Sequence, residues 1–450
     1  MTSRSGPARL AGVRPGEATA VALAAVYFFA LLCGMYMLRP LREEMGIRGG
    51  VERLDRAFLT TFGAMLVAVP AASAIFARVP RGRAIPAVYG FFALNLVGFA
   101  ALFARGTHPG AGHAPAWAPH AFFAWVSVYN LFVTSVFWSF MSDLFTSEQG
   151  RRLFGLVSAG GSAGALAGPA VAAVLVAPVG ASGVMLASAA LLAVAAGCAQ
   201  ALARRASREA AAVRHEGGAV GGGAFAGFTS LARSPYLAAL ALHTVGITVS
   251  ATFLYFQQAR VVAAALPSPA RRVQLFAAID LGVNVLSLVL QALATGRVLT
   301  GAGLLPGLLV HPALALAGLA AIAAAPSLAV VASVQALRRA VHYAIERPAR
   351  EVLFTVVPRE DRYKTKGVVD TVVYRGGDAA SALAQGRLLA AGVGFAGSAL
   401  LATPLVLAWA AVALCLVRKH ARLELSTGDH PQAHVDGSAP AGTHPPHAGG

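Results

Sequence analysis

Long apolar stretches separated by short polar segments dominate this chain. Each stretch is close to the roughly twenty residues that cross about 30 Å of hydrocarbon as an α-helix. The strands of a membrane barrel would instead alternate apolar and polar positions over about ten residues, and this alternation is absent. The pattern therefore predicts a polytopic, all-α membrane protein with twelve transmembrane helices, at about 18–38, 57–77, 84–104, 118–141, 153–177, 179–202, 236–258, 274–296, 303–325, 327–347, 367–389 and 392–417.

Composition agrees with this interpretation. The chain is 57% hydrophobic and 12% charged, more apolar than a soluble core of this length can bury. The net charge is +17, but the sequence contains no soluble basic domain of the kind that binds nucleic acid. We therefore expect no nucleic-acid partner. With both termini in the cytoplasm, the inside segments hold 22 Lys and Arg residues and the outside segments hold 10. The positive-inside rule favours this orientation, in a bacterial inner membrane.

The predicted span at 327–347 carries more charge than a passive membrane helix tolerates. Arg338, His342 and Glu346 follow one another at intervals of four residues and share one helix face. An Arg or an acid near the middle of a span costs roughly 2.5–3.5 kcal/mol on insertion scales. Such residues are retained where they face a protein interior or a wet cavity. Arg347 also fits a snorkelling helix end, but Arg338 and Arg339 lie halfway along and indicate a cavity.

The two halves of the chain contain an internal sequence repeat. Leu144-Phe-Thr146 recurs as Leu353-Phe-Thr355, and the glycines Gly160, Gly164 and Gly168 correspond to Gly376, Ala380 and Ala384. Small residues at this spacing let helices approach closely. The sequence thus predicts a six-helix half at 1–202, a central cytoplasmic loop at 203–235, a second six-helix half at 236–417 and a disordered cytoplasmic tail at 418–450.

Two pseudo-symmetric six-helix halves joined by a central loop resemble the major facilitator superfamily, whose halves rock about a site near the bilayer midplane. Within it, the segment Tyr36-Met-Leu-Arg-Pro-Leu-Arg-Glu-Glu-Met-Gly46 resembles one found in the ATP/ADP translocase family of nucleotide transporters. Phe137-Trp-Ser-Phe-Met-Ser-Asp-Leu-Phe145 resembles that family's fourth span, and 350–378 resembles its tenth-to-eleventh span region. The resemblance covers most of the membrane region. It implies a transporter that exchanges nucleotides.

The arginines give independent reason to expect an anionic cargo. Arg39 and Arg42 lie one helical turn apart, although both side chains have the alternative of snorkelling to the headgroups. Arg375 lies beside Gly376-Gly377, where a ligand can come close. Guanidinium groups bind phosphate or carboxylate with two parallel hydrogen bonds. The predicted substrate-binding residues are Arg39, Arg42, Arg338, Arg339, His342 and Arg375.

Acidic residues supply the opposite charge. A buried carboxylate can pair with arginine across the halves or carry a coupled proton. Asp280, Glu346 and Asp378 are the predicted proton or counter-charge sites, and Asp143, Arg152 and Asp370 are predicted to take part in gating. A plain solvated loop around Asp143 and Arg152 is the alternative.

The sequence contains no motif for enzymatic chemistry, such as a phosphate-binding loop, a zinc-protease motif or a nucleophile elbow. We therefore expect no enzyme, metal or cofactor. We expect a monomeric secondary transporter of organic anions that exchanges nucleotides or phosphorylated metabolites across the bilayer. The alternatives are a proton-coupled exporter of amphipathic small molecules, using Asp280 or Glu346, and a non-transporting receptor or scaffold.

Overall fold

The computed structural model describes residues 13–14, 16–78, 81–104, 114–209 and 226–428. Within these ranges the chain is almost entirely helical and has no strand. Among the described residues, nine helices are long and apolar enough to cross a membrane. The first half consists of α1 (Ala18–Arg48), η2 (Val51–Arg53), α2 (Leu54–Arg78), α3 (Arg81–Ala104), α4 (Ala118–Leu144) and α5 (Ser147–Glu209).

The second half contains short helices in series where its spans are charged or bent. A connecting helix, α6 (Ala226–Arg233), precedes it. Its elements are α7 (Pro235–Ala265), α8 (Pro269–Leu290), η4 (Gln291–Thr295), η5 (Val298–Ala302), α9 (Leu304–Ala324), α10 (Leu328–Val341), η6 (His342–Glu346), α11 (Arg347–Leu353), α12 (Arg359–Val368), η7 (Val369–Val373), α13 (Tyr374–Ala390) and α14 (Phe395–Gly428).

These elements form the twelve predicted membrane segments. Helix α5 provides two of them, because Gly180 turns the chain with a positive φ of 66° that a glycine adopts without strain. Two more are the composite segments α10–η6–α11 and α12–η7–α13. Between α9 and α10, Pro326 precedes Ser327, whose hydroxyl accepts a hydrogen bond from the backbone N–H of Val330. The predicted division of 303–347 is therefore confirmed.

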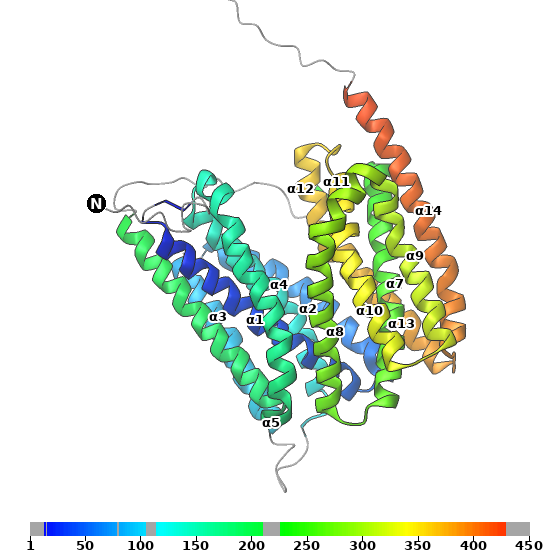
Figure 1. Ribbon diagram of the computed structural model, residues 1–450, viewed down its shortest axis with the longest axis horizontal. Helices are drawn as coiled ribbons and strands as arrows, with labels where there is room; N and C mark the ends of the chain where they lie inside the picture. Colours follow the sequence, from blue (N-terminus) through cyan, green and yellow to red (C-terminus); the bar gives the residue numbers. More distant parts are fainter. Residues whose placement is uncertain (1–12, 15, 79–80, 105–113, 210–225, 429–450) are drawn as a thin grey trace, which may run out of the picture.

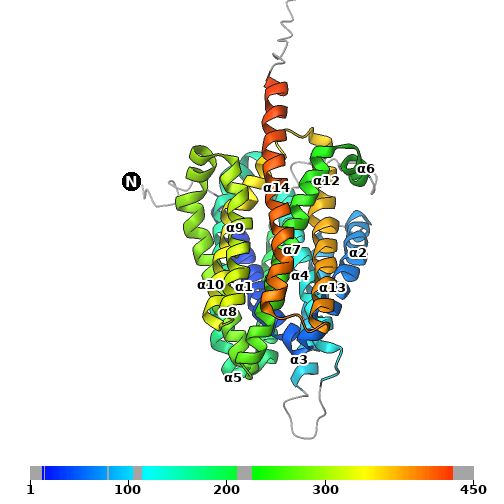
Figure 2. The ribbon, with the colours of Figure 1, turned by 90° about the vertical axis from the view of Figure 1, so that its right-hand side faces the viewer.

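The helices assemble into two bundles, α1–α5 and α7–α14, that meet at the lower end of Figure 1 and stand apart toward its upper end (Figure 1). Helix α8 packs against α1 and α5, and α13 packs against α2, so these three helix pairs join the bundles. The view from the side shows α14 running up the outside of its bundle beside α7 and α9 (Figure 2). The structure is thus an all-α membrane fold of twelve segments in two six-helix halves, as predicted.

Contacts between the bundles concentrate at the end where they meet. One apolar cluster there combines Leu54 and Phe123 of the first half with Phe256 and Phe276 of the second. Arg272 of α8 lies 3.4 Å from the buried carboxylate of Glu44 on α1. Under the predicted orientation this closed end faces outward, and the opposite end faces the cytoplasm.

The predicted repeat has a packing counterpart in each half. A Cβ atom on Gly160 or Gly164 of α5 would collide with the backbone of α1, and one on Gly377 of α13 would collide with Thr248 of α7. These glycines allow α5 to pack closely on α1 and α13 on α7, but Gly376, the predicted counterpart of Gly160, meets only Phe62 of α2, at 3.7 Å.

Several predicted boundaries differ from the structure, and three of the differences lie in polar segments. Helix α1 continues past residue 38 to Arg48, so the predicted outside segment 39–56 is mostly helical and its first arginines lie inside the protein. Helix α14 continues past 417 to Gly428, and the predicted tail beyond it lies outside the described residues. The predicted loop 203–235 includes the end of α5 and all of α6, while 210–225 lie outside the described residues. Pattern alone ended these spans too early because polar residues here continue helices.

Candidate functional site

A cavity of about 1190 Å³ lies between the two bundles. It is lined from the first half by α1, α2 and α4 and from the second by α7, α8, α10 and the segments that follow α10 and α12. A second cavity of about 600 Å³ adjoins it. The two share a wall made of Arg39, Arg42, Tyr343, Arg347, Tyr374 and Arg375. Both cavities therefore meet at a band of arginines and tyrosines.

The larger cavity has an excess of positive charge. Its carboxylates are Glu43, Asp280, Asp370 and Asp378. Its arginines are Arg39, Arg42, Arg338, Arg339, Arg347, Arg350 and Arg375. Seven guanidinium groups facing four carboxylates in a water-restricted space attract anions. Arg39 and Arg42, which lie one helical turn apart, both line this cavity.

Besides Arg39, which lies 3.8 Å from Asp280, four of these arginines have a carboxylate partner beside them. Arg42 lies 2.8 Å from Glu43, and Arg375 lies 3.5 Å from Asp378. Asp370 lies 3.4 Å from Arg350, whose guanidinium also donates to the hydroxyl of Thr244. The fourth, Arg339, pairs with Asp280. These pairs hold the guanidinium groups in place around the space that a ligand would occupy.

Asp280 of α8 connects the two halves through its side chain. Its carboxylate lies 2.6 Å from Arg339 of α10 and 3.8 Å from Nε of Arg39 on α1. The carboxyl group is 4% exposed, while each arginine is about one-fifth exposed. Asp280 is therefore a counter-charge both to Arg39 of the first half and to Arg339 of the second half.

Arg338 is the exception among the buried arginines. It is 7% exposed and has no carboxylate partner among the described residues. Its guanidinium donates to Oε1 of Gln335 at 3.0 Å and approaches Nε2 of His311 at 3.5 Å, and its Nε has no hydrogen-bond partner there. A buried cation without a counter-charge is costly unless an anion joins it. Arg338 lines the cavity, so a bound anion can serve as that partner.

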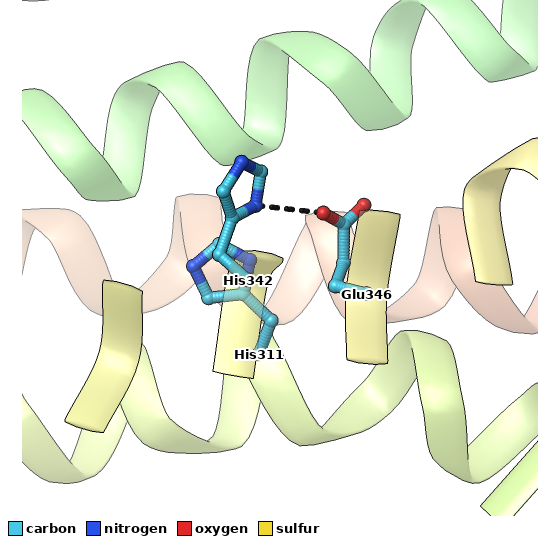
Figure 3. Close-up of side chains that lie close together, drawn as sticks. All are labelled: His311, His342 and Glu346. Carbon is cyan, nitrogen blue, oxygen red and sulfur yellow. Dashed lines mark ion pairs between the residues drawn. The ribbon is translucent and has the colours of Figure 1, made fainter. Parts of the chain in front are cut away.

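Glu346 lies behind the cavity wall, where it is fully buried. Its carboxylate contacts two histidines: His342 Nδ1 at 2.7 Å and His243 Nε2 at 3.3 Å. Figure 3 shows His342 directed at Glu346 with the ring of His311 close to both. His342 also lines the cavity. The predicted common face of Arg338, His342 and Glu346 thus becomes one connected cluster.

Helix geometry accounts for this arrangement. The segments η6 and η7 are π-helical, and their i→i+5 hydrogen bonds each enclose one more residue than those of an α-helix. Such bulges rotate the following side chains and are frequent at functional sites. The η6 bulge carries His342 and Glu346, and η7 carries Asp370.

The remaining predicted gating residues lie apart from the cavity. Arg152 at the start of α5 makes two hydrogen bonds of 2.8 Å with Glu17, which immediately precedes α1. The Arg152 guanidinium, together with the backbone N–H of Arg14, lowers the pKa of Glu17 to about 2. Asp143 is exposed near the end of α4. The pair of Arg152 and Glu17 ties the chain before α1 to α5 within the first half.

Several residues of the site were not expected. Arg347, interpreted as a snorkelling residue, lines both cavities, and Arg350 is buried beside Asp370. His243 of α7 and His311 of α9 complete the cluster around Glu346. Both histidines lie inside apolar spans, and an ionisable residue there is itself a sign of function. Counting intramembrane histidines would have found them.

No family model and no curated protein matches this sequence. Solved structures do match its fold. A bacterial homologue of the human lysosomal transporter Spinster, inward-facing and unoccupied, is 14% identical, with 92% of this chain and 99% of that one covered and a TM-score of 0.57. A bacterial homologue of the iron transporter ferroportin, also inward-facing, is 12% identical, covering 87% and 98% of the two chains, with a TM-score of 0.63. A POT-family peptide transporter is 13% identical, covering 90% and 97%, with a TM-score of 0.61.

Proposed function

We propose that this protein is a secondary active transporter of organic anions. The observation that carries the proposal is the buried guanidinium of Arg338, which lines a cavity between two helical bundles and has no carboxylate partner among the described residues. The surplus of arginines around it favours the same charge of ligand. The similarity of the fold to solved transporters supports movement of that ligand across the membrane.

Nucleotides or phosphorylated metabolites, moved by exchange, are the substrates we favour. The segment that resembles the ATP/ADP translocase family contributes Arg39 and Arg42 to the cavity. The cavity also holds aromatic rings from both halves, including Phe58, Phe62 and Tyr255. Arginines bind phosphate through two parallel hydrogen bonds, and aromatic rings offer a stacking surface to a nucleobase.

A proton-coupled exporter of amphipathic compounds is the second candidate, and one wall of the cavity favours it. Helix α2 lines the cavity with an entirely apolar face of Phe58, Phe62, Met65, Leu66, Val69 and Pro70. These positions recur at helical spacing, so they form one stripe that suits an apolar body as well as a base. A receptor or scaffold that binds without transport is the third candidate.

We place the protein in a bacterial inner membrane with cytoplasmic termini, acting as a monomer without catalytic activity. The excess of Lys and Arg in the segments assigned to the cytoplasm supports this orientation. Both halves of one chain line the cavity, so the proposed site does not require a second copy.

Exchange by purified protein in liposomes tests the function. The liposomes are loaded with ADP, inorganic phosphate, a sugar phosphate or no anion, and uptake of the corresponding labelled compound is followed at equal pH on both sides. Uptake that requires internal anion supports exchange. Uptake of an amphipathic dye driven only by a pH gradient supports the exporter instead. Binding without movement of any compound supports a receptor and contradicts transport.

A further inference from the structure

We propose that His342 and Glu346 form a proton-binding site, and that proton binding there is coupled to anion binding at Arg338. This inference rests on the proposed anion transport, because it assigns the energy source for that same cavity. It starts from three side chains, His311, His342 and Glu346, whose ligand atoms all lie within 4.8 Å of one another. His311 and Glu346 are fully buried, and His342 is 16% exposed at the cavity.

Hydrogen bonding fixes which ring nitrogen carries the hydrogen in His243 and His311. The indole N–H of Trp409, which can only donate, lies 3.0 Å from Nδ1 of His243. The lone pair of His243 must therefore be on Nδ1 and its hydrogen on Nε2, where it faces Glu346 at 3.3 Å. Likewise Arg338, which can only donate, faces Nε2 of His311 and leaves the hydrogen on Nδ1. His243 and His311 are thus held as neutral rings.

This assignment argues against a metal ion at the cluster. A metal binds the lone pair of an imidazole nitrogen, but the nitrogens of His243 and His311 that lie toward Glu346 carry hydrogens. Arg338 also places a permanent positive charge beside the site, which opposes a divalent cation. His342 and Glu346 alone are too few ligands for a structural zinc site.

A proton fits the same atoms. A fully buried carboxylate needs a counter-charge or must be neutralised, and the nearest candidate is His342 Nδ1, 2.7 Å from Oε2 of Glu346. One proton makes this pair neutral, either as carboxylate with imidazolium or as carboxylic acid with imidazole. Because His342 lines the cavity, its ring can accept a proton from cavity water and pass it to Glu346. Nothing else is consumed or released.

Other charges surround the pair. They belong to the elements packed around η6, and among the described residues they are His243 of α7, Asp280 of α8, His311 of α9, Arg338 and Arg339 of α10, and Arg347 and Arg350 of α11. Asp280 is paired with Arg339, and Arg350 is paired with Asp370. Arg338 is therefore the buried permanent charge near Glu346 that no carboxylate offsets.

The charges of Glu346 and Arg338 determine whether proton binding strengthens or weakens anion binding. With the proton absent, Glu346 and Arg338 carry opposite charges without direct contact, and His311 lies close to both. An anion that binds Arg338 cancels its positive charge, so the carboxylate is left without compensation and the pair binds a proton more tightly. By linkage, a proton on the pair strengthens anion binding by the same factor. The cavity would thus take up anion and proton together.

Infrared titration of the full-length protein in lipid nanodiscs tests the site directly, between about pH 5 and pH 8. We expect the carboxylic-acid or imidazolium signal of one bound proton to disappear in Glu346→Gln. It should remain in Glu351→Gln, a matched change on the same segment at a carboxylate that pairs with Lys366. Adding ADP as the probe at fixed pH should increase the signal, and Arg338→Gln should abolish that increase. A wild-type titration identical to that of Glu346→Gln would overturn the proposal.

A zinc-binding measurement and two liposome assays distinguish failure of the proton site from failure of the proposed transport function. Binding of one equivalent of zinc that is lost in both Glu346→Gln and His311→Gln would establish a metal site and overturn the proton site. In liposomes, ADP counterflow at equal pH tests the proposed function, whereas accumulation driven by a pH gradient tests the inference. Gradient-driven accumulation should fall at least about tenfold in Glu346→Gln. Counterflow that proceeds without any effect of pH would leave the transporter standing and contradict the coupling.

Discussion

Arg39 of α1 and Arg339 of α10 share one carboxylate, that of Asp280, at 3.8 Å and 2.6 Å. Asp280 and Arg339 belong to the same half, whereas Arg39 belongs to the other. Separation of the halves would therefore break the longer contact and preserve the shorter one. An anion that binds Arg39 would compete with Asp280 for the same guanidinium. This single carboxylate can thus link occupation of the cavity to the relative position of the bundles.

Asp280→Asn should destabilise the protein and slow exchange. It leaves Arg39 and Arg339 in the cavity without their counter-charge, at a cost of about 2 kcal/mol after allowing for the partial exposure of both arginines. Thermal unfolding of the single variants Asp280→Asn and Arg339→Gln and of the double variant measures this. The double variant should recover part of the loss. Strictly additive losses would show that the pair contributes no coupling.

Close packing of α5 on α1 predicts a second outcome. Gly164→Ala would push a Cβ atom into the backbone of Phe29 and Cys33, and we expect a loss of about 1–3 kcal/mol from overpacking. Gly197→Ala on the same helix is the control, because a Cβ atom there meets open space. That variant should stay within about 0.5 kcal/mol of wild type. Equal thermal stability of the two variants would contradict the packing account.

Glu17 and Arg152 predict how stability depends on pH. The pKa of Glu17 is lowered from 4.5 to about 2 by Arg152, so its contribution is complete above pH 4.5 and is lost as the pH falls toward 2. The difference in melting temperature between wild type and Glu17→Gln should be constant from about pH 6 to pH 8 and shrink in acid. A difference that changes between neutral and mildly alkaline pH would rule out this pairing as its source.

Topology gives a fourth prediction. Reporter fusions after Arg83, within 203–235 and after Arg422 should all be cytoplasmic, because the Lys and Arg residues gather in these segments. Fusions near Gly110 and Pro267 should be external. An external reporter within 203–235 would contradict the arrangement of six helices on each side of a cytoplasmic loop.

The fold was predictable because span length and apolar content follow from the thickness of the membrane. The repeat was also readable, since close helix packing requires small residues such as Gly164 at fixed spacing. Span ends were less predictable. Arg39 and Arg42 look like residues beyond the end of a helix, but α1 continues through them to Arg48 because a cavity accommodates their charge.

Sequence patterns could not predict which side chains pair with each other within the site. Helical spacing placed Arg338, His342 and Glu346 on one helix face, but it did not show which side chains pair. The partners that Glu346 has include His243, from a helix about a hundred residues away along the chain. Contacts between helices depend on their rotation and on bulges such as η6, which no periodicity within one helix reveals.

The most direct test of anion transport through this cavity is exchange by Arg338 variants, measured with the fastest-exchanging anion of the liposome panel. Arg338→Gln should lose about 100-fold or more in exchange rate, because the anion loses its buried partner. Arg338→Lys should retain little activity, since an ammonium group cannot form two parallel hydrogen bonds. Arg297→Gln, at an exposed arginine near the end of the same bundle's α8 segment, should exchange like wild type.

The Arg338→Gln protein should also melt no lower than wild type, because it loses an uncompensated buried charge, and the anion should no longer raise its melting temperature. A stable, inactive protein that the anion does not stabilise is the predicted result. Exchange at the wild-type rate by a folded Arg338→Gln protein would contradict the account.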